Sequence, residues 1–153
     1  MITIGGVMSP ALGAAVHAFP GVPASVGAAR RWVRGVLALA DLTGEPADTA
    51  VLLVSELATN SLAHTASGEA GGWFRLRVRC GPQRVRVECE DAGNRTGARP
   101  RYAMSGPEDT RGRGLALVAE LADAFGDRAD ATGRTVFFEL HRSPSPPTRR
   151  GAP

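Results

Sequence analysis

The spacing of apolar residues predicts two long helices in the first half of the chain. A helix over residues 23–40 would collect its apolar side chains on one face, and Pro23 suits its first turn. The apolar positions of this segment are Val26, Ala29, Trp32, Val33, Val36, Leu37 and Leu39. A second helix is expected over residues 47–64, after a break with Gly and Pro at 43–46.

A strict alternation of apolar and charged residues predicts a β-hairpin over residues 75–80 and 84–90. A four-residue loop over 81–84 sets a register that places opposite charges across from each other on the outer face. The facing positions would be Cys80 with Val85, Val78 with Val87, Leu76 with Cys89, Arg77 with Glu88, and Arg75 with Glu90.

This register bears on the two cysteines, Cys80 and Cys89. It leaves them about four residues apart along the strands, roughly 13 Å at ~3.3 Å per residue. A disulfide needs Cα atoms within about 7 Å of each other. We therefore expect two buried thiols, and their spacing matches no metal motif.

The rest of the chain predicts shorter elements. In chain order we expect a flexible lead-in over 1–12, a weak edge strand near 14–18, a long loop over 92–111, a helix over 115–122, a turn region over 127–133, a strand over 135–140, and a disordered Pro- and Arg-containing tail over 143–153. One domain would cover residues 13–142. Antiparallel strands with grouped helices predict an α/β protein of the α+β two-layer sandwich type, with a mostly antiparallel sheet and about three helices on one face.

Composition narrows the classes of protein. The 153 residues, 43% of them hydrophobic, suffice for one domain with a core. No apolar run approaches the ~18 residues of a membrane span, and the N-terminus lacks the basic start of a signal peptide. We expect a cytoplasmic protein with no membrane partner.

Charge gives weaker information. All 18 basic residues are Arg, and the formal net charge is +3. A nucleic-acid surface needs clustered basic residues with aromatic residues nearby. The arginines are scattered here and only 5% of residues are aromatic, so we expect no direct nucleic-acid partner.

A polar stripe interrupts the second predicted helix. Glu56, Asn60 and His64 recur every four residues, which places them on one side of that helix. An Asn oxygen suits Mg²⁺, which borrows further ligands from substrate phosphates, and a Glu one turn away could act as a base. The structural alternative is a solvated helix face, which fits poorly with an otherwise apolar helix.

Asp91-Ala92-Gly93 stands where the second hairpin strand ends. A carboxylate there could accept a hydrogen bond from an exocyclic amine, and Gly93 would let a flat ring approach the backbone. Taken alone, the stretch is better explained as a simple strand-ending turn.

A glycine-rich segment, Arg111-Gly112-Arg113-Gly114, leads directly into the apolar run that begins at Leu115. Free N–H groups and the helix dipole at such a helix start favour an anion such as phosphate. A packing or connecting role is the alternative. The segment is neither a Walker loop nor a full dinucleotide fingerprint.

Together and in this order, the three stretches resemble the Bergerat-type ATP-binding domain of the GHKL superfamily, which includes gyrase and the histidine kinases. The N-box helix of that family carries Glu followed four residues later by Asn, as Glu56 and Asn60 do. Its G1 box is Asp-x-Gly, as in Asp91 and Gly93, and its G2 box is a Gly-x-Gly entering a helix, as in Gly112–Gly114.

The resemblance covers residues 15–141 and implies roles for the matching residues. It implies that Asn60 ligates Mg²⁺ and that Glu56 is the general base. It also implies a lid over 94–111. Phosphates would be bound around Arg111, Gly112, Arg113, Gly114 and Leu115.

The resemblance also implies an adenine pocket. Asp91 would bind the adenine amine, while Gly93 and Thr135, a Thr in the last strand, would shape the pocket. His64 would cap the end of its helix.

The chain is similar to the stand-alone anti-sigma-factor serine/threonine kinases in five short segments, at 19–21, 23–25, 29–30, 53–57 and 112–118. That family implies ATP and Mg²⁺ as cofactors. It also implies a sigma factor or an antagonist protein as partner, phosphorylation of a Ser or Thr on the antagonist, and a possible homodimer.

Three departures from the family pattern leave two hypotheses. Ser61 stands where Ala usually follows the Asn, the lid carries no obvious catalytic signature, and the sequence contains no readable partner-binding motif. The first hypothesis is an ATP-dependent serine/threonine kinase. The second is an ATP-binding module that sequesters a partner without transferring phosphate.

Overall fold

A computed structural model describes residues 6–9, 13–64, 71–92, 113–131 and 133–142. Its elements are β1 (Gly6–Ser9), β2 (Ala14–Pro20), α1 (Ala24–Leu39), α2 (Gly44–His64), β3 (Trp73–Cys80), β4 (Arg84–Asp91), α3 (Arg113–Leu121), β5 (Ala124–Ala129) and β6 (Arg134–His141).

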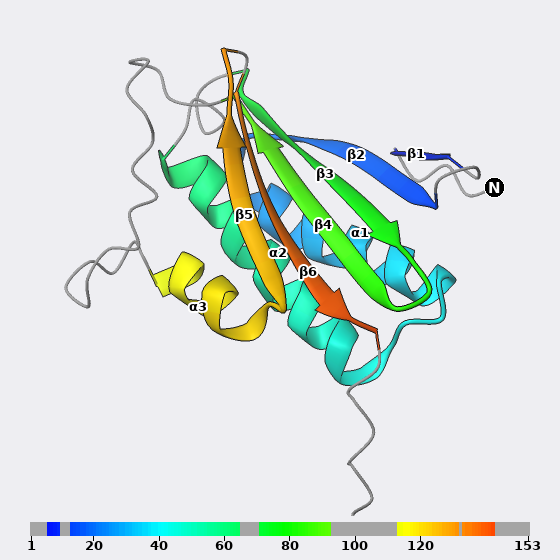
Figure 1. The fold of residues 1–153 in the computed structure, drawn as a ribbon. Coiled ribbons are helices and arrows are strands. Elements are labelled where there is room, and N and C mark those ends of the chain that lie inside the picture. Colours follow the sequence, from blue (N-terminus) through cyan, green and yellow to red (C-terminus); the bar gives the residue numbers. More distant parts are fainter. Residues whose placement is uncertain (1–5, 10–12, 65–70, 93–112, 132, 143–153) are drawn as a thin grey trace, which may run out of the picture.

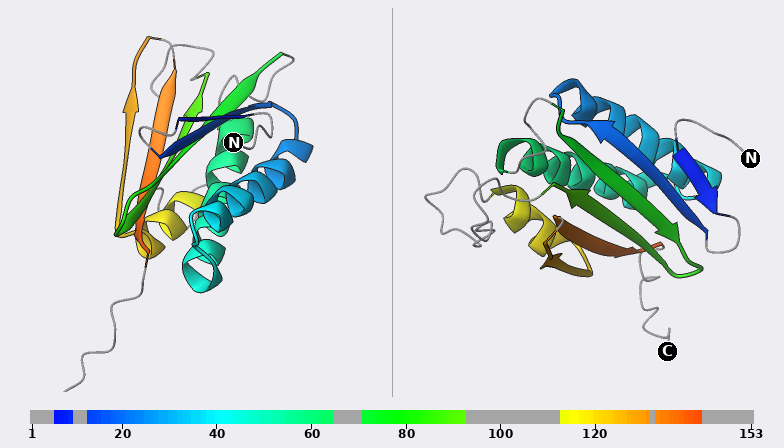
Figure 2. Two further views of the ribbon diagram at one scale, coloured as in Figure 1. Left: turned by 90° about the vertical axis from the view of Figure 1, so that its right-hand side faces the viewer. Right: turned by 90° about the horizontal axis from the view of Figure 1, so that it is seen from above.

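The strands of the described residues form one six-stranded sheet in the order β1-β2-β3-β4-β6-β5 (Figure 1). Every neighbouring pair is antiparallel. The three helices lie against one face of this sheet and leave its other face uncovered (Figure 2). The predicted two-layer α+β architecture is confirmed.

The predicted β-hairpin is confirmed in its register. Cys80 pairs with Val85 and Leu76 with Cys89, so the two cysteines lie at separate places in the sheet. Both are free thiols, but only Cys89 is buried as predicted, because Cys80 at the end of β3 is partly exposed. The opposite-charge pair of Arg75 and Glu90 forms on the uncovered face.

Two strands contradict the sequence predictions. Residues 6–9, expected in a flexible lead-in, form β1 and pair with β2, which is therefore not an edge strand. The segment Ala124–Ala129, part of which was expected to be a turn, forms β5 on β6. Neither strand alternates apolar and polar residues. Each is therefore formed by main-chain pairing with its neighbour in the sheet and not by a pattern of side chains.

The ends of the helices have local causes. Helix α1 ends in a Schellman motif, in which Leu42 N–H donates to Leu37 O (2.9 Å) and Asp41 N–H to Ala38 O (3.0 Å). Asp41 takes the left-handed conformation usually given to Gly, with φ of 59°. Helix α2 begins at Gly44, three residues before its predicted start, because Pro46 is tolerated in a first turn.

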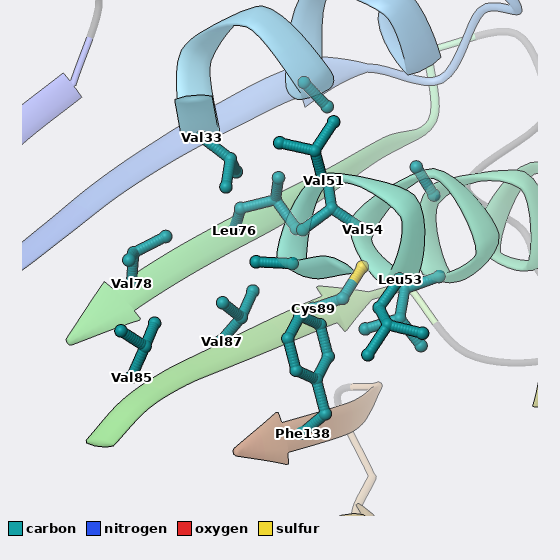
Figure 3. Packing of buried hydrophobic residues seen from close by; sticks show 14 of the residues in the cluster. Val33, Val51, Leu53, Val54, Leu76, Val78, Val85, Val87, Cys89 and Phe138 are labelled. Atoms are coloured by element: carbon teal, nitrogen blue, oxygen red, sulfur yellow. The ribbon is translucent and has the colours of Figure 1, made fainter. Parts of the chain in front are cut away.

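The core fills the layer between the helices and the sheet. Alternate residues of β3, β4 and β6 point toward α1 and α2 (Figure 3). Val33, Val54, Leu76, Val87 and Phe138 are each fully buried there. No helix of the described residues is long and apolar enough to cross a membrane.

Candidate functional site

Buried polar side chains gather at one end of the molecule. The described residues bury five polar or charged side chains, with exposed fractions of 3% for Ser25, 7% for Asn60, 2% for Ser61, 1% for Asp91 and 3% for Arg134. All except Ser25 lie where the C-terminal part of α2, the end of β4 and the start of β6 meet (Figure 1). This buried polar cluster is the candidate site.

Asp91 occupies the last helix-facing position of β4. The preceding positions on that face are Val85, Val87 and Cys89, all buried. A carboxylate in such a place is costly unless it is hydrogen-bonded. Ser61 of α2 donates from Oγ to Asp91 Oδ2 over 3.4 Å, which ties the helix to the strand end.

Asn60 carries a buried donor without a partner. Its side-chain Nδ2 makes no hydrogen bond within the described part of the chain. Leaving such a group unpaired costs about 1–3 kcal/mol, so it calls for a functional explanation. A bound ligand that accepts from Nδ2 would remove this cost.

Glu56 lies one turn before Asn60 on α2 and is half-buried. The helix therefore keeps the predicted acid and amide on one side. No group of three His, Cys, Asp or Glu side chains in the described residues could hold a metal ion. A divalent cation at Asn60 would thus draw further oxygen ligands from a bound phosphate, as Mg²⁺ commonly does.

Gly133 allows the start of β6 to approach Asp91. A Cβ at this position would lie 2.1 Å from the Asp91 carbonyl oxygen, closer than any real contact. The turn before it is closed by Asp130, whose N–H donates to Gly133 O (2.9 Å) and whose Oδ1 accepts from Gly133 N–H (3.1 Å). Glycine is therefore required by the close approach of two strands at the site.

The structure contradicts the predicted position of Thr135. Thr135 pairs with Glu90, and both side chains lie on the uncovered face of the sheet, where they line a small hollow with Arg75 and Arg128. Side chains alternate across a strand, so Thr135 cannot share the face of Asp91.

Arg134 is the residue that sequence reasoning missed. It pairs with Asp91 in the ladder, faces the helices and donates to Asp127 over 2.7 Å. The even-numbered residues of β6 face the helices, as the buried Val136, Phe138 and Leu140 show. This alternation could have placed Arg134 on the same face, but the apolar Phe137 between them made the pattern hard to read in the sequence.

The glycine-rich segment is described only in part. Helix α3 begins at Arg113, so Gly114 and Leu115 lie in its first turn. The helix packs on α2 and buries Val118 in the core. Gly93, Arg111, Gly112, the predicted lid over 94–111 and the tail over 143–153 lie outside the described residues, as does the side chain of His64.

Burial keeps both thiols protonated in the folded protein, Cys89 beside the site and Cys80 at the far end of the β3–β4 hairpin. Burial raises the pKa of Cys89 to about 12, although a hydrogen bond with Ser61 opposes the rise. Burial also raises the pKa of Cys80. Since the thiolate is the reactive form, neither cysteine is a nucleophile near neutral pH.

A second hollow lies on the outer side of the helices. It has a volume of about 220 Å³ and is lined by Gly27, Arg30, Arg31 and Arg34 of α1 and Val51 of α2. Arg34 pairs with Asp48 over 2.9 Å. Arg30 and Arg31 are exposed and have no ion-pair partner in the described part of the chain, so this arginine groove carries uncompensated positive charge.

Comparison with known proteins matches residues 19–139 to the histidine kinase-like ATPase domain. The chain is also 28% identical over 116 residues to a protein of Streptomyces antibioticus named a probable dTDP-4,6-dihydroxy-2-methyloxan-3-one 4-ketoreductase. That similarity covers 72% of this chain but 37% of the relative. The chain therefore spans little more than a third of that relative, and the similarity does not assign the relative's activity to this chain.

Proposed function

Because the chain belongs to the family of histidine kinase-like ATPase domains, we propose that it is an ATP-dependent regulator of the anti-sigma-factor kinase type. ATP binding follows from the family. The single observation that supports the location of the nucleotide is the buried polar cluster, in which the unpartnered Asn60 amide lies next to Ser61 and its bond to Asp91.

The cluster suits the two ends of a nucleotide. The Asp91 carboxylate accepts a hydrogen bond from the 6-amino group of adenine. Asn60 can offer its amide oxygen to Mg²⁺ and its Nδ2 donor to a phosphate oxygen. Magnesium bound there would neutralise phosphate charge during transfer. The first turn of α3 would add N–H donors for the phosphates.

In the kinase reaction, a Ser or Thr hydroxyl of the antagonist attacks the γ-phosphorus of ATP. Glu56 accepts the hydroxyl proton, and the bond from the γ-phosphorus to the bridging oxygen breaks to release ADP. Glu56 is suited to this role because it is half-buried and one turn from Asn60. The alternative is a module that binds ATP and a partner without this step.

The arginine groove supports the partner part of the proposal. Within the described part of the chain Arg30 and Arg31 have no ion-pair partner, and both line a hollow together with Val51. Guanidinium groups bind carboxylates in a fixed, paired geometry. An acidic segment of a sigma factor or antagonist protein would fit this surface, and charge reversal at Arg30 and Arg31 should weaken its binding.

Calorimetric titration with ATP, with and without Mg²⁺, tests the nucleotide site. Wild-type protein should bind ATP more tightly with Mg²⁺. Asn60→Ala should weaken the ATP affinity measured with Mg²⁺ by tenfold or more, roughly the effect of one charge-assisted contact. Thr59→Ala, an exposed neighbour on α2, is the matched control and should behave as wild type. Absence of ATP binding by folded wild-type protein would contradict the proposal.

Transfer of the labelled γ-phosphate to a co-purified antagonist separates the kinase from the binding module. Glu56→Ala should abolish transfer while it leaves ATP and partner binding intact. If wild-type protein binds both ATP and the antagonist but never transfers phosphate, the binding module is the correct function.

A further inference from the structure

The arginine groove follows one stripe of helix α1. Its residues from this helix are Gly27, Arg30, Arg31 and Arg34. They stand at the spacing i, i+3, i+4 and i+7, so they share one side of the helix. At 1.5 Å per residue they span about 10 Å, roughly two helical turns. Helix α2 packs beside α1 and contributes Val51 (Figure 2). The groove is therefore long enough for several residues of a partner.

The groove combines charged and apolar surface. Arg30 and Arg31 are exposed, whereas Val51 is 3% exposed and offers only an apolar side chain. An arginine also covers a surface with its methylene stem while its charged end stays in water. Arg34 is already paired with Asp48 over 2.9 Å. A ligand that carried negative charge alone would match Arg30 and Arg31 and leave the apolar part of the groove to water.

Gly27 keeps the hollow open. It lies inside α1 with an ordinary backbone conformation, so the helix itself would be more stable with Ala there. Outside the backbone of its own helix, a Cβ would meet only Arg31 Nη1 within 4 Å, at 3.4 Å. A methyl group would therefore fit the free protein but would occupy part of the hollow. The volume of about 220 Å³ is far above the ~10–15 Å³ that one water molecule needs, so a side chain can enter.

We propose that the arginine groove binds a segment of the partner protein in which an apolar side chain has carboxylates on either side. The apolar side chain lies over Gly27 and Val51, and the carboxylates pair with Arg30 and Arg31. Guanidinium groups hold carboxylates in a fixed geometry, and burial of the apolar side chain adds affinity that charge alone does not supply. This inference rests on the partner binding proposed above and states the chemistry of the bound segment.

Two short peptides test the inference. Each has a run of glutamates on both sides of one central residue, which is leucine in the first peptide and serine in the second. Titration of each peptide into the full chain is followed by the NMR shifts of the α1 amide signals. Wild-type protein should bind the leucine peptide about tenfold more tightly, the effect of burying roughly half of a leucine side chain.

Gly27→Ala separates the apolar part of the groove from its charge. It should weaken binding of the leucine peptide about three- to tenfold and leave the serine peptide unchanged, because the methyl group takes the space of the leucine side chain. Gly35→Ala is the matched control, since Gly35 is exposed on the same helix and its Cβ would have nothing within 4 Å. Both substitutions should raise the midpoint of thermal unfolding by about 2–4 °C, but only Gly27→Ala should change peptide binding.

The double variant Arg30→Gln with Arg31→Gln tests the charged part of the groove. It should weaken both peptides to a similar degree and keep the preference for leucine, because the hollow itself is unchanged. Loss of that preference in the double variant would overturn the division of the groove into a charged and an apolar part.

The remaining outcomes are distinct. Equal affinity of wild-type protein for the two peptides, or a Gly27→Ala protein that binds the leucine peptide as wild type does, would overturn the inference alone. Inorganic phosphate that displaces the leucine peptide at a similar concentration would show a simple anion site and would overturn it as well. Binding of neither peptide by folded wild-type protein would overturn both the inference and the partner part of the proposed function, while the ATP titration would still decide the nucleotide part.

Discussion

The two faces of the sheet hold charge in opposite ways. On the uncovered face Arg75 binds Glu90 at 2.8 Å, and Arg86 binds both Glu88 (3.1 Å) and Glu139 (3.0 Å). On the covered face the buried side chains of β3, β4 and β6 are apolar until the buried polar cluster at one end. Charge is abundant and paired where water is near, and scarce where it is excluded.

This difference shows that burial identifies the site better than the number of charges does. Ion pairs exposed to water contribute about 0–1 kcal/mol each, so many can be gained or lost at little cost. A polar group removed from water is costly unless it has partners. Asn60, whose Nδ2 has no hydrogen-bond partner in the described part of the chain, therefore marks the place where we propose that a ligand binds.

Two adjacent phenylalanines give the largest expected effect. Phe138 is fully buried on the covered face, whereas Phe137 lies on the uncovered face with the Arg86 guanidinium 3.8 Å from its ring centre. Phe138→Ala should lower the free energy of unfolding by about 3–5 kcal/mol, because it leaves a cavity. Phe137→Ala should cost about 1 kcal/mol. Urea unfolding of both variants measures the contrast, and equal losses would refute it.

Gly133→Ala should have the next largest effect. Its Cβ would meet the Asp91 carbonyl oxygen at 2.1 Å, and a backbone group cannot move aside cheaply. We expect a loss of about 2–3 kcal/mol in unfolding free energy, together with weaker ATP binding. Gly126→Ala is the control, since its Cβ would meet only the Phe137 ring at 2.8 Å, which can turn away. A stable Gly133→Ala protein with normal ATP affinity would contradict this account.

Alkaline pH should destabilise the protein through Cys89. Burial raises the pKa of this thiol from its ordinary value of 9.0 to about 12. The unfolded chain therefore ionises first, and stability present below pH 9.0 is lost as the pH rises toward 12. Between about pH 8 and pH 10 the loss from this group should be about 1.4 kcal/mol.

The measurement is the free energy of unfolding of wild type and Cys89→Ala at both pH values. Cys80 is present in both proteins, so the difference between their pH dependences reports Cys89. Parallel pH dependences would show that the thiol is not desolvated as described.

Arg75→Ala should have the smallest effect. Arg75 Nη2 donates to both carboxylate oxygens of Glu90, but both side chains are over one-third exposed. We expect a loss of about 0.5 kcal/mol at low salt, less at high salt, and no change in ATP affinity. Urea unfolding at two salt concentrations tests this, and a loss above about 2 kcal/mol would show that the uncovered face contributes more than exposed pairs do.

The parts of the fold that were predicted from sequence are the segments in which apolar residues recur at the regular spacing of a helix or a strand. The hairpin register follows from alternation and charge pairing, and the helices follow from apolar spacing. β1 and β5 have no such period, so they could not be predicted from local pattern. The N-box, with Glu56 and Asn60 on one side of α2, was also predictable because both residues lie on one helix.

The sequence by itself determined the antiparallel hairpin, the helices and the family motifs, because each is a short-range pattern in a periodic backbone. Only the tertiary structure decided which polar residues meet. It put Thr135 on the uncovered face, brought Arg134 and Gly133 to Asp91, and placed Ser61 against Cys89. The physical reason is that a contact between a helix and the sheet depends on which face of its strand a residue occupies and on where the helix packs over the sheet. Neither is encoded within one segment of the sequence.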